Sequence, residues 1–184
     1  MPRIAEGTFA GLHGDEIALF NQFLAGLTGA GVEIGCCDGF STVHILEASL
    51  LHLTSIDPFV PDSMEPSLRG LPSRFAANVA PYGSRSTLLV SRSELESARW
   101  KTPLAFLFID GDHRYEAVCR DLEEWSPHLV AGGILAMHDS RMNRGGAPFH
   151  PGPSRVADES VYGAPGRWRI LGEAFSLTLA RKVA

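Results

Sequence analysis

The sequence predicts an α/β fold with a mostly parallel, seven-stranded sheet, helices on both of its faces and an antiparallel hairpin at the C-terminal end. Short apolar segments alternate with helical segments from residue 32 to residue 137, which is typical of a parallel sheet. Residues 104–109 are apolar without alternation, as expected for a central strand covered on both faces. In such sheets a ligand lies beyond the carboxyl ends of the strands, so the loops there should form the site.

The elements follow from local patterns. A helix is expected over residues 15–27, because acids occupy its first turn and apolar residues recur at helical spacing, and Thr28-Gly-Ala-Gly31 should end it. Gly132 and Gly133 should turn into the fifth strand, and Gly172 should join the two strands of the hairpin. Strands are expected at 32–34, 52–56, 86–90, 104–109, 134–137, 167–171 and 174–180. Further helices are expected at 41–50, 72–79, 94–98, 156–162 and from Tyr115 to the turn at Pro127.

Length and composition favour one domain over residues 1–184, with an N-terminal helical cap over 1–30 and a substrate-side loop over 141–155. The net charge is -5 and the positive charges are scattered, so no nucleic-acid partner is expected. No apolar run reaches the ~18 residues of a membrane span, and no signal peptide is seen, so we expect a cytoplasmic protein without a membrane partner. A homo-oligomer is left open. The three cysteines are expected to be reduced thiols, with a chemical role for Cys36 or Cys37 left open.

The segment Val32-Glu-Ile-Gly-Cys-Cys-Asp-Gly-Phe-Ser41 is the most informative in the chain, because it describes a buried strand that turns sharply into a helix. Asp57 ends the next strand, about 20 residues further on, where an acid can accept hydrogen bonds from ribose hydroxyls. Cys37 stands where a dinucleotide site has its middle glycine, and an acid at Glu33 would repel phosphates and attract an ammonium group. These residues favour a nucleoside that has an amino acid attached, and they disfavour a nicotinamide dinucleotide.

Four segments together resemble class I S-adenosylmethionine-dependent methyltransferases, and in particular the small-molecule O-methyltransferase group labelled methyltransferase family 24. The first is Glu33-x-Gly35-x-x-x-Gly39 with Asp57 after the following strand. The others are Phe108-Ile-Asp-Gly-Asp-His-Arg-Tyr115, Asp121-Leu-Glu-Glu-Trp-Ser-Pro127 and Gly132-Gly-Ile-Leu-Ala-Met-His-Asp139. The resemblance covers residues 11–181 and implies a Rossmann-like methyltransferase fold with S-adenosyl-L-methionine as the cofactor.

The resemblance also implies roles for individual residues on the cofactor side. Glu33, Gly35, Gly39 and Ser41 match the motif that holds the methionine end of the cofactor, and Asp57 matches the acid that binds the ribose. Ser93 follows the third strand, where relatives place a small residue or a hydroxyl beside adenine. Ser93 is equally suited to be the N-cap of the helix that follows it.

Methyl transfer to oxygen requires a base for the hydroxyl proton and a charge that stabilises the resulting anion. Asp110 directly follows the central strand and matches the aspartate that binds magnesium in metal-dependent relatives, while His113 matches the position of their catalytic base. A neutral imidazole suits that role near neutral pH. A helix-start histidine without chemistry is the alternative for His113, and Asp112 is expected to cap the next helix.

His138 and Asp139 end the fifth strand and should lie beside Asp110, where relatives have the remaining metal ligands. Magnesium prefers oxygen ligands, so an imidazole at position 138 would favour manganese or another transition metal. A divalent cation, magnesium or manganese, held by Asp110, His138 and Asp139 is therefore expected. The alternative is that His113 and His138 form a metal-free acid and base pair. A metallophosphohydrolase would need further histidines and acids on surrounding helices.

The expected substrate is a small molecule with a hydroxyl, such as a sugar, a vicinal diol or a catechol-like compound. Arg141, Arg144, Phe149 and His150 in the substrate-side loop could contact it. Two other functions stay open. One is a relative of the cephalosporin-hydroxylase group, which resembles the same fold, and the other is a catalytically silent S-adenosylmethionine-binding partner protein.

Overall fold

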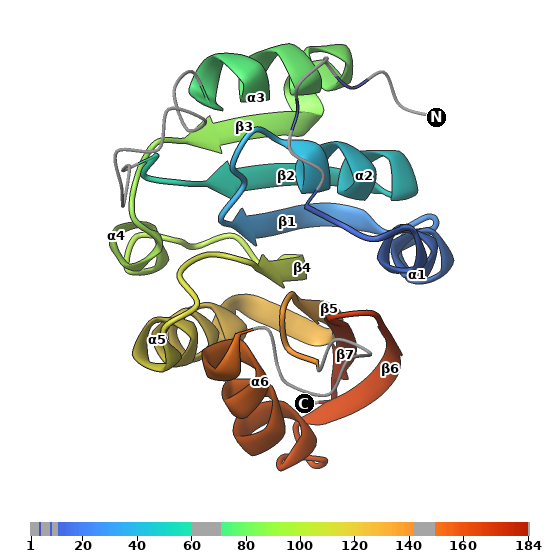
Figure 1. Cartoon of the computed structure of the whole chain (residues 1–184), viewed down its shortest axis with the longest axis vertical. Coiled ribbons are helices and arrows are strands. Elements are labelled where there is room, and N and C mark those ends of the chain that lie inside the picture. The colour runs from blue at the N-terminus through green and yellow to red at the C-terminus, as the bar shows by residue number, and fades with distance from the viewer. Residues whose placement is uncertain (1–3, 5–7, 9–10, 60–70, 142–149, 184) are drawn as a thin grey trace.

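The computed structural model describes residues 4, 8, 11–59, 71–141 and 150–183. Its sheet has seven strands in the order β3-β2-β1-β4-β5-β7-β6 (Figure 1). The strands are β1 Thr28–Ile34, β2 Leu50–Ile56, β3 Ser86–Leu89, β4 Leu104–Ile109, β5 Leu129–Met137, β6 Trp168–Ala174 and β7 Leu177–Lys182. Strands β1 to β5 pair in parallel, and β7 pairs antiparallel with both β5 and β6. This confirms the predicted fold class.

Helices cover both faces of the sheet, with α1 and α2 on one face and α4, α5 and α6 on the other (Figure 1). The helices are α1 Gly14–Leu24, α2 Phe40–Ala48, α3 Leu71–Val79, α4 Ser93–Ser97, α5 Tyr115–Trp125 and α6 Pro151–Val156, with shorter turns η2 Ala80–Arg85 and η3 Ser126–His128 and a π-helical turn η4 Ala157–Tyr162. One hydrophobic core packs α5 and α6 against the sheet around Trp125, and the other packs α1 and α2 against it around Phe20. No helix in these described ranges is long and apolar enough to cross a membrane.

The glycines near the sheet are the main cause of wrong boundaries. Thr28-Gly-Ala-Gly31 was expected to end the first helix, but it forms the beginning of β1 and pairs with β2 from Leu50 onward. The helix ends three residues early, at Leu24, and residues 28–30 of the expected N-terminal cap belong to the sheet. Gly31 fits there because a side chain would press on Leu53 and Leu51 of β2, at 3.1 and 3.3 Å.

Gly132 and Gly133 lie within β5, not before it, so that strand begins at Leu129. Gly132 has a positive φ of 83°, and the register between β4 and β5 shifts at this point, as at a β-bulge. Two glycines in sequence therefore mark an irregularity inside the strand. They do not mark a turn.

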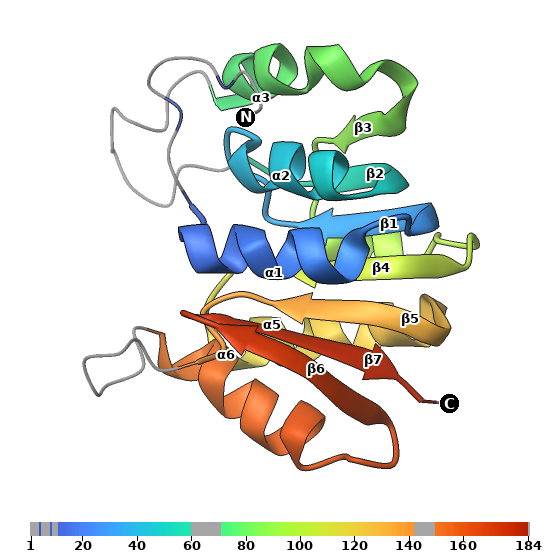
Figure 2. The same ribbon diagram turned by 90° about the vertical axis from the view of Figure 1, so that its right-hand side faces the viewer.

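The hairpin turns at Phe175 and Ser176, so the prediction that Gly172 joins its strands was wrong. Gly172 lies inside β6, where a Cβ atom would meet Leu19 of α1 at 2.9 Å. The glycine there makes room for a helix that packs on the strand. This turn position matters for the site, because the hairpin turn lies beside the end of β5 (Figure 2), where the carbonyl oxygen of Ser176 accepts a hydrogen bond from the hydroxyl of Ser140.

Candidate active site

Gly35 lies where the loops after β1 and β4 cross. Its φ is +82°, and a Cβ atom there would lie 2.6 Å from the carbonyl carbon of Asp110. Gly39 is the N-cap of α2 with a φ of +87°, and a Cβ atom there would meet the ring of Phe75 at 3.0 Å. The glycine turn predicted from the sequence is thus packed directly against the segment that contains the predicted catalytic residues.

Glu33 is fully buried beneath this turn, and its carboxylate accepts three hydroxyl hydrogen bonds. Ser41 donates at 2.5 Å, Thr42 at 2.6 Å and Ser55 at 2.6 Å. Burial raises the pKa of Glu33 to about 7 even though the three hydroxyls favour the charged form. The hydrogen bond between Ser41 and Glu33 therefore stabilises the turn from beneath. Thr42 and Ser55 were missed, although Ser55 is a polar residue in a mostly apolar strand.

Asp57 at the end of β2 lies against the same turn, as predicted. Its Oδ2 atom accepts hydrogen bonds from the backbone N–H groups of Cys36 at 3.1 Å and Cys37 at 3.0 Å. Its Oδ1 atom accepts one from the N–H of Phe59 at 2.7 Å. Cys37 has a positive φ of 47°, and burial raises the pKa of both cysteine thiols. The two cysteines are free and protonated near neutral pH.

Ser93 begins α4, but the N-cap of that helix is Arg92 and no side chain caps it. The hydroxyl of Ser93 instead donates to Oδ1 of Asp121 on α5. Burial raises the pKa of Asp121 to about 6. The alternative that Ser93 is an N-cap was therefore wrong, and its hydroxyl joins two helices on one face of the sheet.

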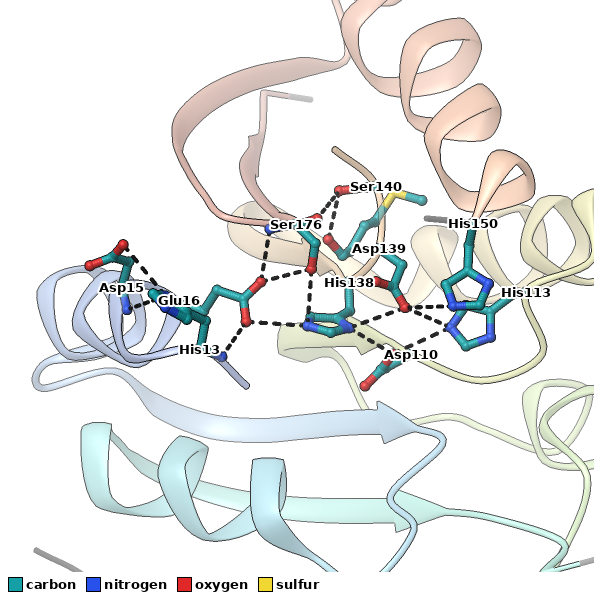
Figure 3. Close-up of polar contacts among 11 residues, drawn as sticks. His13, Asp15, Glu16, Asp110, His113, His138, Asp139, Ser140, His150 and Ser176 are labelled. Atoms are coloured by element: carbon teal, nitrogen blue, oxygen red, sulfur yellow. Dashed lines mark hydrogen bonds and ion pairs between the residues drawn. The ribbon is translucent and has the colours of Figure 1, made fainter. Parts of the chain in front are cut away.

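Asp110, His113, His138 and Asp139 lie together at the carboxyl ends of β4 and β5 (Figure 3). His113 Nε2 lies 3.0 Å from Asp139 Oδ2 and 3.9 Å from Asp110 Oδ1. His138 Nδ1 lies 3.2 Å from Asp110 Oδ1 and 3.6 Å from Asp139 Oδ2. Asp110 and His113 precede His138 and Asp139 by 25 residues or more in the sequence. The adjacent parallel strands β4 and β5 bring all four into one cluster.

Two residues that were not predicted as site residues complete the cluster from the other side. Glu16 of α1 places Oε2 at 3.3 Å from His138 Nε2, and Ser176 of the hairpin turn places its Oγ at 3.2 Å from the same nitrogen. The only sequence signal for Glu16 was its place in the first turn of a helix, which has an ordinary explanation as a helix-dipole residue. Ser176 gave no signal because the turn was placed elsewhere.

The carboxylates and imidazoles shift one another's pKa values. Burial lowers the pKa of His138, but hydrogen bonds and charges from Asp110, Asp139 and Glu16 outweigh it and raise the pKa to about 12. Hydrogen bonding to Asp139 raises the pKa of His113. Burial raises the pKa of Asp110, whereas the two imidazoles hold that of Asp139 well below its usual range despite burial. Asp139 is the most strongly ionised acid of the cluster.

His150 stacks on His113, with ring centroids 4.0 Å apart and planes inclined by 17°. Its Nε2 atom lies 3.7 Å from Asp139 Oδ2. His150 thus comes from the expected substrate-side loop and reaches the cluster, whereas Arg141 pairs with Tyr162 and Asp158 on the neighbouring helical turn. Arg144 and Phe149 lie outside the described residues.

Asp112 does not cap α5 as expected. The N-cap of α5 is Arg114 without a side-chain cap, and Asp112 Oδ1 accepts a hydrogen bond from the N–H of Arg114 at 2.9 Å. Its carboxylate also pairs with the guanidinium group of Arg114. Asp112 therefore shapes the turn just before the helix and does not contact the cluster through the contacts described.

The cluster contains two sets of three groups that suit a metal ion. In one set Asp110, His138 and Asp139 offer ligand atoms within 4.8 Å of one another, and in the other His113, Asp139 and His150 do so. The first set agrees with the prediction and has a further feature of protein metal sites, because a carboxylate lies on the far nitrogen of its imidazole. In the second set the two rings are stacked, so their nitrogen lone pairs do not converge on one point. The first set is the better fit.

A hollow of about 640 Å³ lies away from the cluster, beside Tyr162, Trp168, Arg169 and Lys182. Trp168 begins β6 and Lys182 ends β7, which runs antiparallel to β5. This hollow therefore lies at the opposite ends of the strands from the carboxyl ends of β1 to β5. None of the predicted site residues lines it.

Comparison with known proteins agrees with this arrangement. Residues 32–140, more than half of the chain, match the sequence model of a family described as a methyltransferase domain. An rRNA methylase from Streptococcus thermophilus is 13% identical and has a TM-score of 0.61, over 92% of this chain and 95% of that one. A SAH-bound Podospora anserina methyltransferase is 16% identical with a TM-score of 0.58, over 84% and 72%. The O-methyltransferase NovP is 16% identical with a TM-score of 0.63, over 92% and 80%. At these identities the three structures show the shared fold.

Proposed function

The chain belongs to the family of S-adenosylmethionine-dependent methyltransferases, and we propose that it methylates a hydroxyl group of a small molecule with the help of a divalent metal ion. A sugar, a vicinal diol or a catechol-like compound is the proposed acceptor. One observation supports this above the others: His113, Asp110, His138 and Asp139 converge at the carboxyl edge of the sheet, directly against the glycine turn at Gly35.

The cofactor is proposed to lie over the turn between β1 and α2. Gly35 and Gly39 give the turn its shape through positive φ angles and close packing on Asp110 and Phe75, while Glu33 and Ser41 support the turn from below through their hydrogen bond. Asp57 is proposed to accept hydrogen bonds from the ribose hydroxyls, since its carboxylate already accepts from N–H donors at the same place. Residues 91–93, which include Ser93, border the adenine. When bound, S-adenosylmethionine supplies the methyl group as part of a sulfonium, which the acceptor oxygen attacks in line.

His113 is proposed as the base. Its imidazole receives the hydroxyl proton of the acceptor, and the carboxylate of Asp139, 3.0 Å from Nε2, stabilises the imidazolium that forms. The side chain is about one third exposed, but Nε2 is buried against Asp139, so the proton is proposed to arrive at the other ring nitrogen, Nδ1. His150, stacked on the same ring, keeps the plane of His113 oriented.

Asp110, His138 and Asp139 are proposed to hold the metal. A bound divalent cation would lower the pKa of the acceptor hydroxyl and orient two acceptor oxygens. An imidazole among the ligands favours manganese over magnesium. The net charge of -5 and the scattered positive charges support a small acceptor and disfavour a nucleic acid.

The test combines cofactor binding with transfer. S-adenosylhomocysteine should raise the melting temperature, and methyl transfer from labelled S-adenosylmethionine to catechol, to free hexoses or to nucleotide-linked hexoses should fall when EDTA is added. Total RNA serves as the competing acceptor. Labelled RNA with no labelled small molecule would overturn the acceptor class, and transfer that is indifferent to EDTA would overturn the metal.

His113→Ala tests the base. We expect turnover to fall by about 100-fold or more while S-adenosylhomocysteine binding is retained, because general-base catalysis contributes about that much. His52→Ala is the matched control, since His52 is exposed on β2 away from the cluster. Unchanged turnover in His113→Ala would show that another group removes the proton.

A further inference from the structure

Glu16 occupies an unusual place for a helix N-terminal acid. Its side chain is 1% exposed, and it reaches across from α1 to the end of β5, 122 residues later in the sequence (Figure 3). Oε2 accepts a hydrogen bond from the N–H of His13 at 2.7 Å and faces His138 Nε2 at 3.3 Å. Oε1 accepts from both the N–H and the hydroxyl of Ser176, at 3.0 and 2.8 Å. One buried carboxylate thus joins α1, β5 and the hairpin turn.

These contacts require an N–H at Nε2 of His138, whether the ring has one hydrogen or two. The backbone N–H groups of His13 and Ser176 and the hydroxyl of Ser176 all donate to the carboxylate of Glu16. This carboxylate therefore acts as an acceptor toward His138 Nε2 as well. The hydroxyl of Ser176 has a single hydrogen, which is directed to Glu16, so toward Nε2 it can only accept. Both neighbours therefore require an N–H at Nε2.

The other nitrogen of the same ring faces the proposed metal ligands. Nδ1 lies 3.2 Å from Asp110 and 3.6 Å from Asp139. A metal-binding imidazole is commonly held in this way, with the far N–H donating to a carboxylate that fixes the tautomer and the ring orientation. The imidazole of His138 is 10% exposed, so little of it contacts water.

We infer that Glu16 is a positioning residue of the active site: it holds an N–H at Nε2 of His138 and so directs Nδ1 toward Asp110 and Asp139, as the nitrogen that a metal ion can bind. Ser176 shares this role through its hydroxyl. The consequence for metal binding rests on the proposed function, whereas the N–H at Nε2 does not. The N-terminal helix and the hairpin turn therefore belong to the active site, although neither contains a residue that touches the reacting atoms.

The first test needs neither metal nor acceptor. In protein labelled with ¹⁵N-histidine, NMR should show a slowly exchanging Nε2–H of His138, assigned by its loss in His138→Gln. Glu16→Gln should shift this signal or make it exchange rapidly, because an amide cannot accept on both sides of its former carboxylate. Asp15→Asn is the matched control from the same turn, with a side chain 65% exposed, and should leave the signal unchanged.

The second test measures Mn²⁺ affinity by calorimetry and S-adenosylhomocysteine affinity in parallel. Glu16→Gln should weaken Mn²⁺ binding by about 10- to 100-fold, the usual effect of removing such a partner, and leave S-adenosylhomocysteine binding unchanged. Ser176→Ala removes only the hydroxyl and keeps the backbone N–H, so a smaller loss in the same direction is expected. If Glu16→Gln fails to fold, Ser176→Ala still tests the inference.

The outcomes separate the two proposals. An Nε2–H signal that is unchanged in both Glu16→Gln and Ser176→Ala would overturn the inference. A signal that responds as expected in a protein that binds no Mn²⁺ would support the positioning of His138 and contradict the metal-assisted function. Equal loss of Mn²⁺ and S-adenosylhomocysteine affinity would indicate general damage to the fold and would overturn the specific role of Glu16.

Discussion

Gly35 shows how a single residue can determine the geometry of the site. It combines a positive φ of 82° with a backbone crossing, because the chain at Asp110 and Gly111 fills the space where a side chain would be. Residue 35 must therefore lack a Cβ atom for the turn expected to hold the cofactor to pack against the segment that contains the proposed base. A substitution at Gly35 would disturb both at once.

Gly35→Ala should lower the free energy of unfolding by about 2–4 kcal/mol, since it combines backbone strain with overlap against backbone atoms. Gly26→Ala is a matched control, because Gly26 also has a positive φ, 73°, but nothing lies within 4 Å of its Cβ position. The control should cost only about 1–2 kcal/mol from the left-handed backbone conformation. Urea denaturation of the two variants measures the difference, and equal losses would show that the crossing is not tight.

Glu33 should make stability depend on pH. Its pKa is about 7 in the folded protein against an ordinary value of 4.5, so the folded state holds this proton more tightly than the unfolded chain does. Stability is therefore lost as the pH rises from about 4.5 to about 7, with a total of roughly 3 kcal/mol at 1.36 kcal/mol per pKa unit.

Glu33→Gln should remove this part of the pH dependence. The difference in unfolding free energy between the wild type and Glu33→Gln, measured by denaturant titration at several pH values, should change across this window and level off above it. A difference that stays constant from pH 4.5 to pH 8 would contradict the raised pKa. Other titrating groups are common to both proteins and cancel in the comparison.

At the scale of elements, the contact between α5 and α6 sets the position of His113. Gly152 in the first turn of α6 is buried against the segment that leads into α5, and a Cβ atom there would lie 2.8 Å from the backbone nitrogen of Tyr115 and closer still to the carbonyl oxygen of His113. The close approach of these two helices needs a residue without a side chain. The helix was expected later in the sequence, at 156–162, so no role was predicted for Gly152.

Gly152→Ala should push α6 away from His113, and we expect turnover to fall together with about 1–3 kcal/mol of stability, the usual cost of overpacking. Binding of S-adenosylhomocysteine should persist, because the glycine turn lies on the other side of β4. Gly166→Ala is the control, since nothing lies within 4 Å of that Cβ position. Normal turnover in Gly152→Ala would mean that the start of α5 adapts without moving His113.

At the scale of the whole molecule, the strand order places the two halves of the site. Strand β1 lies between β2 and β4, so the turn after β1 touches both Asp57 and the segment after β4. Strand β5 lies between β4 and β7, so His138 has Asp110 on one side and the hairpin turn on the other. Helix α1 packs against β6, and its N-terminal end lies on the same side of the molecule as the hairpin turn (Figure 2), so Glu16 reaches His138.

The sequence by itself determined the fold class, the alternation of strands and helices, the glycine turn with Asp57, and the family. These follow from patterns along the chain: apolar periodicity, turn residues and the polar residues that directly follow each strand. Asp110, His138 and Asp139 were identified in the same way, because they directly follow predicted strands, whereas His113 was identified through the family resemblance. The roles assigned to these residues stay proposals.

Only the tertiary structure decided what surrounds these residues. Glu16 and Ser176 lie 160 positions apart and share a hydrogen bond, and Thr42 and Ser55 meet at Glu33 from different elements. The glycines at positions 29, 31, 132, 133 and 172 were misassigned because a glycine that ends an element is identical in sequence to one inside a strand, where it makes room for a neighbour, as at 31 and 172, or lies at a bulge, as at 132. Whether a glycine turns the chain or admits another segment depends on what packs against it, and that is fixed only when the whole chain folds.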